Sequence, residues 1–267
     1  MAGEDRDRSH FCTELFSDSA LVLRNSQKAA GEYSTLWPTT REFRLVLSVK
    51  FLNGSDFQRN KVKQYAVQWD TASALGWNGK RKFLFSFLPD NAQTSDIRIL
   101  FQPGGSSSYI GSDCKRIRQD QPTTFFGWVN ESESEESIRQ VILHELGHAI
   151  GYIHEHQSPT ANIPWNREKV YQYYHDTQNP PWTRQMVDNN VFYKYLESST
   201  NSTAFDPKSI MLYAIPSILT TDGSSTTWNS ELSDLDKSFI KKIYPYQPCE
   251  PGVTCCFDKK GRRIPCP

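Results

Sequence analysis

The chain has 267 residues, which is long enough to bury a core and suits one large domain or two small ones. Its 30 basic and 30 acidic residues give no net charge, so the overall charge favours neither nucleic acid nor an anionic membrane as a partner. No apolar run approaches the roughly 20 residues needed to span a bilayer. The charged first residues have no apolar segment behind them, so they do not form the pattern of a signal peptide.

Residues 1–34 are polar apart from one short apolar patch, and we interpret them as an arm or a pro-segment remnant. Two of its side chains could bind a metal and hold an enzyme latent, Cys12 as a thiolate and Asp18 as a carboxylate. The alternative, which we favour from the sequence, is a disulfide between Cys12 and Cys114 and a solvated Asp18.

A strand, a helix and further strands are predicted over the first half of the chain. Strict alternation over 43–51 predicts a half-buried strand with Phe43 on its apolar face. Ser55 and Gln58 have the spacing of a capping box at the start of a helix. The apolar stripe of that helix is formed by Val62, Tyr65, Ala66 and Trp69. Later strands are expected at 83–88, 97–101 and 124–129. The glycine- and serine-rich stretch 104–108 is expected to be a loop.

The next helix carries the pattern H-E-x-x-H-x-x-G-x-x-H, from His144 to His154. Two histidines four residues apart share one helix face, so His144 and His148 can reach one metal ion. Gly151 lets the backbone leave the helix through a left-handed residue, and His154 can then approach the same ion from another direction. Three imidazoles with one open position form the donor set of a catalytic zinc site. Glu145 can accept a proton from an attacking water without being a ligand itself.

Incidental, solvated histidines are the alternative interpretation of this helix. Four of the six histidines of the chain fall between 144 and 156, which argues against it. The pattern Ser132-x-x-Glu135 predicts where the helix begins.

After Pro159 the chain becomes rich in aromatic residues, amides and prolines. A helix is predicted over 166–175, a short apolar turn at 209–213, and a last helix capped by Ser233.

The tail at 246–267 holds four of the six cysteines, all in the last nineteen residues. An even number of clustered cysteines favours disulfides and an oxidising compartment, and therefore a secreted protein. A small zinc site is the competing interpretation, but the run C-x5-C-C-x9-C lacks paired C-x2-C spacing.

The extended histidine motif resembles that of the metzincin metalloproteases, and within them the chain is most similar to the astacin family. Three features carry this resemblance: Glu155 directly after the third histidine, Ser209-Ile210-Met211-x-Tyr213 about fifty-five residues later, and Leu232-Ser233-x-x-Asp236 before the last helix. The chain departs from the family pattern at Tyr152 and Leu212, where astacins usually carry phenylalanine and histidine. The run from His156 to Pro159 is similar to that of microbial members.

The resemblance implies an α+β metzincin fold, with a mixed twisted sheet, a zinc-binding helix and a mostly irregular or helical second part. The catalytic domain would span 35–245, divided into subdomains at 35–154 and 155–245. Its implied zinc ligands are His144, His148 and His154, with one Zn2+ per chain.

Four more roles follow from the same resemblance. Glu145 would be the general base, and Met211 would form a floor beneath the metal. Tyr213 would be a fifth, displaceable zinc ligand that later hydrogen-bonds the oxyanion. Glu155 would meet the buried N-terminus of a mature enzyme, provided that the arm is removed.

We therefore expect a secreted, monomeric zinc endopeptidase that acts on proteins or peptides, with no nucleic-acid or membrane partner. The substrate would lie extended against an edge strand, with 108–113 as its rim. A catalytically silent zinc-bearing module that binds peptides or glycans is the alternative, and the presence of Glu145 argues against it. A serralysin-like metzincin would carry glycine- and aspartate-rich calcium repeats, and the sequence has none.

Overall fold

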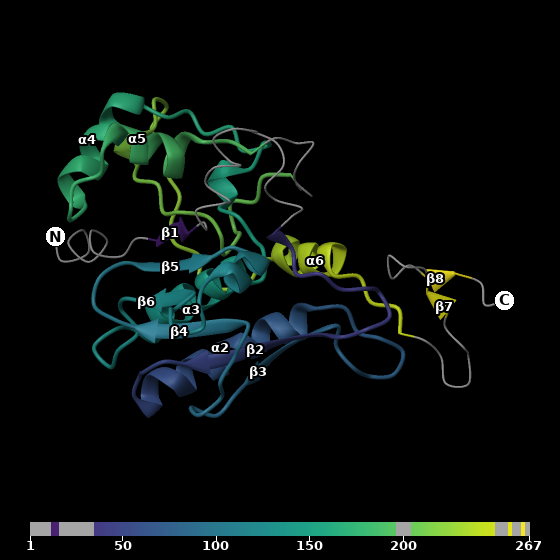
Figure 1. Cartoon of the computed structure of the whole chain (residues 1–267). Coiled ribbons are helices and arrows are strands. Elements are labelled where there is room, and N and C mark those ends of the chain that lie inside the picture. The colour runs from purple at the N-terminus through teal and green to yellow at the C-terminus, as the bar shows by residue number, and fades with distance from the viewer. Residues whose placement is uncertain (1–11, 16–34, 196–203, 249–255, 258–262, 265–267) are drawn as a thin grey trace.

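The computed structural model describes residues 12–15, 35–195, 204–248, 256–257 and 263–264, and Figure 1 shows the path of the chain. Within these residues, six strands form one mixed sheet in the order β1-β5-β6-β4-β2-β3. The strands are β1 (Cys12–Leu15), β2 (Leu45–Phe51), β3 (Phe83–Phe87), β4 (Ile97–Phe101), β5 (Ser106–Tyr109) and β6 (Thr124–Phe126). Neighbouring strands run parallel, except that β5 and β6 are antiparallel.

The helices of the described residues fall into two groups. The sheet is accompanied by α2 (Asp56–Ala72), α3 (Glu135–Ala149) and the 3-10 turn η2 (Gly111–Arg116). The second half contains η3 (Glu155–Gln157), α4 (Arg167–Thr177), α5 (Arg184–Val187), η4 (Asp188–Phe192), η6 (Ser217–Leu219) and α6 (Asp234–Ile243). A small hairpin of β7 (Cys256–Phe257) and β8 (Arg263–Ile264) lies near the C-terminus. The expected α+β class is confirmed.

The main core lies between the sheet and helices α2 and α3. The alternation predicted for β2 is confirmed, since Leu45, Leu47, Val49 and Phe51 are all buried. Phe43 is the exception to that prediction. It lies before the strand begins and is 60% exposed, so it does not share the buried face.

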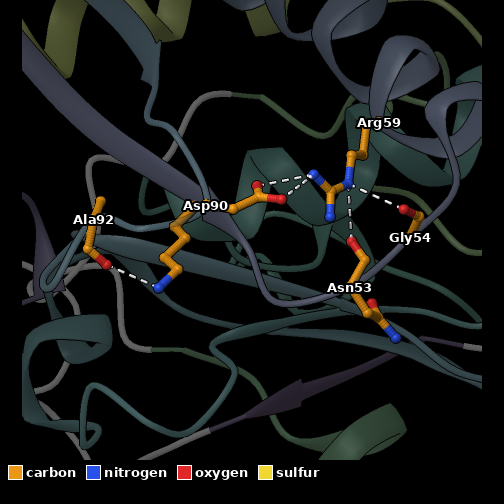
Figure 2. Close-up of polar contacts among 6 residues, drawn as sticks. Asn53, Gly54, Arg59, Asp90 and Ala92 are labelled. Carbon is orange, nitrogen blue, oxygen red and sulfur yellow. Dashed lines mark hydrogen bonds and ion pairs between the residues drawn. The ribbon is translucent and has the colours of Figure 1, made fainter.

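Helix α2 begins as predicted, and its first turn is bonded to the turn before it and to the loop after β3. Ser55 and Gln58 form the expected capping box. One turn later, the Arg59 side chain donates to the carbonyls of Asn53 and Gly54 and pairs with Asp90, as Figure 2 shows. These bonds join the turn before α2 to the loop after β3.

The prediction of a loop at 104–108 is wrong from Ser106 onward, because Ser106–Tyr109 forms strand β5. Ser106 and Ser108 point into the protein, and both are buried. The Ser108 hydroxyl lies 2.9 Å from that of Thr124 on β6, so polar pairing replaces the apolar contacts that a sequence pattern detects. Of the predicted substrate rim at 108–113, the first two residues belong to β5, which pairs with β1, and 111–113 belong to η2.

Helix α3 begins two residues later than predicted, because the capping side chain is Ser134 rather than Ser132. Its end is the turn that the sequence predicts. Gly151 has a φ of +103°. The amides of Gly151 and Tyr152 donate to the carbonyls of His148 and Gly147, at 2.8 and 2.9 Å, which is a Schellman motif. This turn reverses the chain beside the histidine-bearing end of α3.

A second apolar cluster occupies the half of the molecule that contains α4 and α5. It is formed by Val170, Tyr174, Trp182, Val187, Val191, Tyr213, Ile215 and Leu219, together with Cys12 from β1. Figure 1 shows β1 between β5 and this half of the molecule. None of the helices in the described part of the chain has both the length and the apolar character of a membrane span.

Asp70 on α2 makes stability depend on pH. Its Oδ1 accepts from the Phe85 amide at 3.0 Å, and burial raises its pKa from 3.8 to about 6 although this bond and Arg44 oppose the rise. The folded protein therefore holds this proton more tightly than the unfolded chain does, so ionisation of Asp70 reduces stability as pH rises from 4 through 6.

An Asp70→Asn variant cannot ionise, yet its amide oxygen can still accept from Phe85. We expect it to be more stable than the parent at pH 7.5 and to lose that advantage as the pH falls towards 4. Urea unfolding of both proteins at several pH values measures the difference. An advantage that stays constant with pH would contradict the assignment.

Gly151→Ala should be strongly destabilising for two reasons. An L-residue is strained at a φ of +103°, and the new Cβ would lie 2.8 Å from Leu36 Cδ2. We expect a loss of more than about 1–2 kcal/mol in the free energy of unfolding. Gly104→Ala is the matched control, because Gly104 has a similarly strained φ of +121° but has no atom within 4 Å of an added Cβ. An equal loss in both variants would mean that Leu36 does not crowd the site.

Candidate metal centre and active site

Helix α3 brings His144 and His148 to one face, and both side chains are buried. The Nδ1 atom of His144 lies 2.8 Å from the Ile210 carbonyl oxygen, and that of His148 lies 2.9 Å from the Tyr152 carbonyl oxygen. A carbonyl oxygen can only accept a hydrogen bond, so each Nδ1 carries the proton. Each Nε2 therefore keeps the lone pair that a metal requires.

His154 reaches the same point from a different element. It precedes η3, three residues beyond the Schellman turn, and its Nε2 lies 3.1 Å from Nε2 of His148. Two nitrogen ligands of a tetrahedral zinc ion would be about 3.3 Å apart, from a Zn–N distance of ~2.0 Å. The spacing of the two rings is therefore that of a shared metal ion.

A fourth donor comes from the arm. One ligand atom each of Cys12, His144, His148 and His154 lies within 4.8 Å of the other three, and all four residues are buried. In the sequence, Cys12 and His144 are 132 positions apart. The structure thus combines the three predicted histidines with the thiol that the sequence offered as one of two alternatives.

The expected disulfide between Cys12 and Cys114 is wrong. Among the described residues, neither of these cysteines is in a disulfide. The reason is the pairing of β1 with β5, in which Cys12 is opposite Ser106 and its side chain packs with the second apolar cluster. The Cys114 thiol points elsewhere, towards the Tyr109 carbonyl at 3.7 Å. Asp18 and the tail cysteines Cys249, Cys255 and Cys266 lie outside the described residues.

The residues present fit a zinc ion. Burial, with a smaller contribution from His148, lowers the pKa of His144 well below its ordinary value, so the ring is neutral. Its buried Nε2 has no hydrogen-bond partner in the part of the chain that the structure describes. A buried nitrogen in that condition costs free energy unless a metal or another group uses its lone pair. Imidazole nitrogen and cysteine sulfur are the ligand types that zinc prefers in proteins.

Cys12 also contacts the two other residues that the sequence assigns to catalysis. The Tyr213 hydroxyl donates to the backbone carbonyl of Cys12. Glu145 is completely buried, which raises its pKa well above the ordinary value, while the nearby Cys12 side chain opposes the rise. Cys12 of β1 therefore lies against the histidines, Glu145 and Tyr213 at the same time.

Rings surround Tyr213 on the side of the metal ligands. Its ring centroid lies 4.4 Å from that of His154 and 4.4 Å from that of His156. His156 is fully buried, and its Nε2 lies 3.0 Å from the Asn190 carbonyl oxygen. The sequence shows His156 only as part of a run that is similar to that of microbial members of the family. Its packing against Tyr213 depends on contacts between distant elements that no local spacing predicts.

The turn at 209–213 packs beneath α3. Met211 is fully buried, and a Cβ added to Gly147 would lie 2.5 Å from Met211 Sδ. The glycine between Glu145 and His148 therefore leaves space for this methionine. Glu155 holds the same turn from the other side. Its amide donates to the Met211 carbonyl at 3.0 Å, and its carboxylate accepts from the Asp206 amide at 2.8 Å.

Comparisons with known proteins identify the family to which the chain is similar. The family model that describes the Astacin peptidase family matches residues 79–242. A solved structure of myroilysin is 41% identical, with 79% of this chain and 96% of that chain covered and a TM-score of 0.71. A crystal structure of myroilysin is 37% identical, with coverage of 88% and 90% and a TM-score of 0.61.

A more distant likeness is to high choriolytic enzyme 1, a hatching-enzyme zinc protease from the medaka fish Oryzias latipes. It is 18% identical, with 80% of this chain and 96% of that chain covered and a TM-score of 0.52, and this likeness shows the fold alone. None of the curated proteins compared with the chain matches it. The family match and the myroilysin structures confirm the resemblance drawn from the motif, and the chain belongs to the astacin family of zinc metalloproteases.

Proposed function

We propose that the protein is a zinc-dependent endopeptidase that hydrolyses peptide bonds in proteins, with His144, His148 and His154 as zinc ligands. The observation that carries the proposal is the convergence of these three rings, Glu145 and Tyr213 around the single residue Cys12. A silent binding module would need the metal ligands but not the acid–base group beside them.

Bound zinc would polarise the substrate carbonyl and lower the pKa of water from ~15.7 to about 7. Glu145 would accept a proton from the attacking water and return it to the leaving amine. The Tyr213 hydroxyl would donate to the carbonyl oxygen as negative charge develops there, as it now donates to the Cys12 carbonyl. The further role of Tyr213 as a displaceable fifth ligand belongs to the same proposal, as does that of Met211 as the floor of the site.

A substrate would lie along β5 in the place of β1. The backbone of β5 faces β6 on one side and β1 on the other, so removal of β1 leaves an edge that an extended peptide can pair with. The part of the substrate beyond β5 would face the apolar cluster that now packs against Cys12. We therefore expect a preference for extended or unfolded protein substrates.

The intact chain would be latent. The Cys12 thiol would supply a fourth zinc ligand. The backbone carbonyl of Cys12 accepts the hydrogen bond of the Tyr213 hydroxyl, which is then not available to a substrate. Residues 1–34 would then be a removable arm, residues 35–245 the catalytic domain, and residues 246–267 a cysteine-rich tail. We further propose that the enzyme is secreted and acts as a monomer.

Glu145→Ala should abolish peptidase activity. We expect zinc-loaded protein freed of its arm to cleave a denatured protein substrate, and the variant to be slower by at least 10²–10⁴-fold, as is usual when a general base is removed. Glu136→Ala on the first turn of the same helix is the control and should retain activity. Equal cleavage by parent and Glu145→Ala would assign the activity to a contaminant and contradict the mechanism.

Cys12→Ala should activate the intact chain. Loss of the thiol removes one of the four ligands and weakens the hold of β1 on the site, so we expect cleavage of a fluorogenic peptide without prior trimming. Cys114→Ala removes an equally buried thiol away from the histidines and should leave the intact chain silent. Latency that persists in Cys12→Ala but ends when the arm is removed would show that β1 blocks the cleft without help from the thiol.

A further inference from the structure

Asp236 lies outside the ring of metal-binding side chains, in the first turn of α6, and is only 4% exposed. Part of its role is local, because Asp236 and Ser233 form the capping box of the helix. The carboxylate has further partners. Its Oδ1 accepts from the Ser209 hydroxyl at 2.8 Å, and its Oδ2 accepts from the Ile210 amide at 2.9 Å. Both oxygens therefore hold the turn that precedes Met211.

The bond to Ile210 continues to the metal site. The Ile210 carbonyl is the group that accepts from Nδ1 of His144, at 2.8 Å. Ile210 thus links the two groups. Its amide donates to the Asp236 carboxylate, and its carbonyl accepts from the His144 imidazole. The bond to the carboxylate at one end fixes the position of Ile210 and favours the bond at the other end.

A second path leads from Asp236 to His148. The backbone carbonyl of Asp236 accepts from the Tyr152 hydroxyl at 2.7 Å. The Tyr152 carbonyl in turn lies 2.9 Å from Nδ1 of His148. The carbonyls that orient the two helix histidines belong to distant segments, the Met211 turn and the residue after Gly151. Both segments are held by the same residue of α6.

We propose that Asp236 is a positioning residue for the zinc site, which sets the orientation of His144 and His148 through the carbonyls of Ile210 and Tyr152. The inference rests on the proposed ligand set. It assigns to α6, an element that contributes no ligand, control of how tightly the metal is bound. Residues that orient metal ligands typically change metal affinity 10–100-fold when they are replaced.

The experiment measures the zinc dissociation constant of the full chain by competition with a chromophoric chelator. We expect Asp236→Ala to weaken zinc binding 10–100-fold. Asp236→Asn keeps one acceptor oxygen but presents an NH2 group where the second accepted, so its affinity should fall between those of the parent and Asp236→Ala. Urea unfolding of each zinc-free variant defines the conditions in which it is folded, and affinities are compared there.

Ser233→Ala separates this role from the capping of α6. It removes the Ser233 hydroxyl, which accepts from the Asp236 amide at 2.9 Å and donates to the Asp206 carboxylate, and it leaves the bond between Asp236 and Ile210 in place. We expect it to lower stability without changing zinc affinity. Zinc affinity within twofold of the parent in folded Asp236→Asn and Asp236→Ala would overturn the inference. Equal weakening in Ser233→Ala would also overturn it, because the effect would then come from the helix start.

His144→Ala in the same assay tests the ligand set itself. We expect that variant to lose tight zinc binding. Retention of zinc at parental affinity would overturn the proposed site, and the inference with it. Loss of zinc in His144→Ala beside unchanged affinity in the Asp236 variants would overturn only the role of Asp236.

Discussion

Three buried imidazoles can serve one metal ion only if they are neutral and if their lone pairs point to a common centre. Burial keeps the ring of His144 neutral here, and backbone carbonyls give His144 and His148 their direction. Helix geometry sets only the spacing of those two side chains. The rotation of each ring depends on the carbonyls of Ile210 and Tyr152, so the turns that carry these residues matter to the site as much as the helix does.

The same centre supports the proposal that one short strand keeps the enzyme latent. β1 adds to the edge of the sheet beside β5, and this pairing carries Cys12 to the histidines. The strand is joined to the rest of the chain, so its thiol acts at a high effective concentration. The backbone carbonyl of Cys12 accepts a hydrogen bond from the Tyr213 hydroxyl at the same time. In the proposed latent state, such a block would leave the metal ligands in their working positions, and release of the strand would be enough for activation.

The position of the site follows from the two apolar clusters. The larger one joins α2 and α3 to the sheet, while the smaller one fills the half that contains α4 and α5. Tyr213 belongs to the smaller cluster and Met211 to the larger, although only one residue separates them. The turn at 209–213 therefore connects both cores, and its bonds to Glu155 and Asp236 hold it where they meet.

Local spacing in the sequence was sufficient to predict that α3 carries His144 and His148 on one face, that Gly151 has a positive φ and that Ser233 caps the last helix. Each of these features depends on neighbours within one or two helical turns. Strand β5 was missed, since its buried serines are satisfied by polar pairing with β6 and leave no apolar alternation. The partner of Cys12 could not be read from the sequence either. A thiol can bond to another thiol or to a metal, and only the pairing of β1 with β5 decides which of them lies within reach.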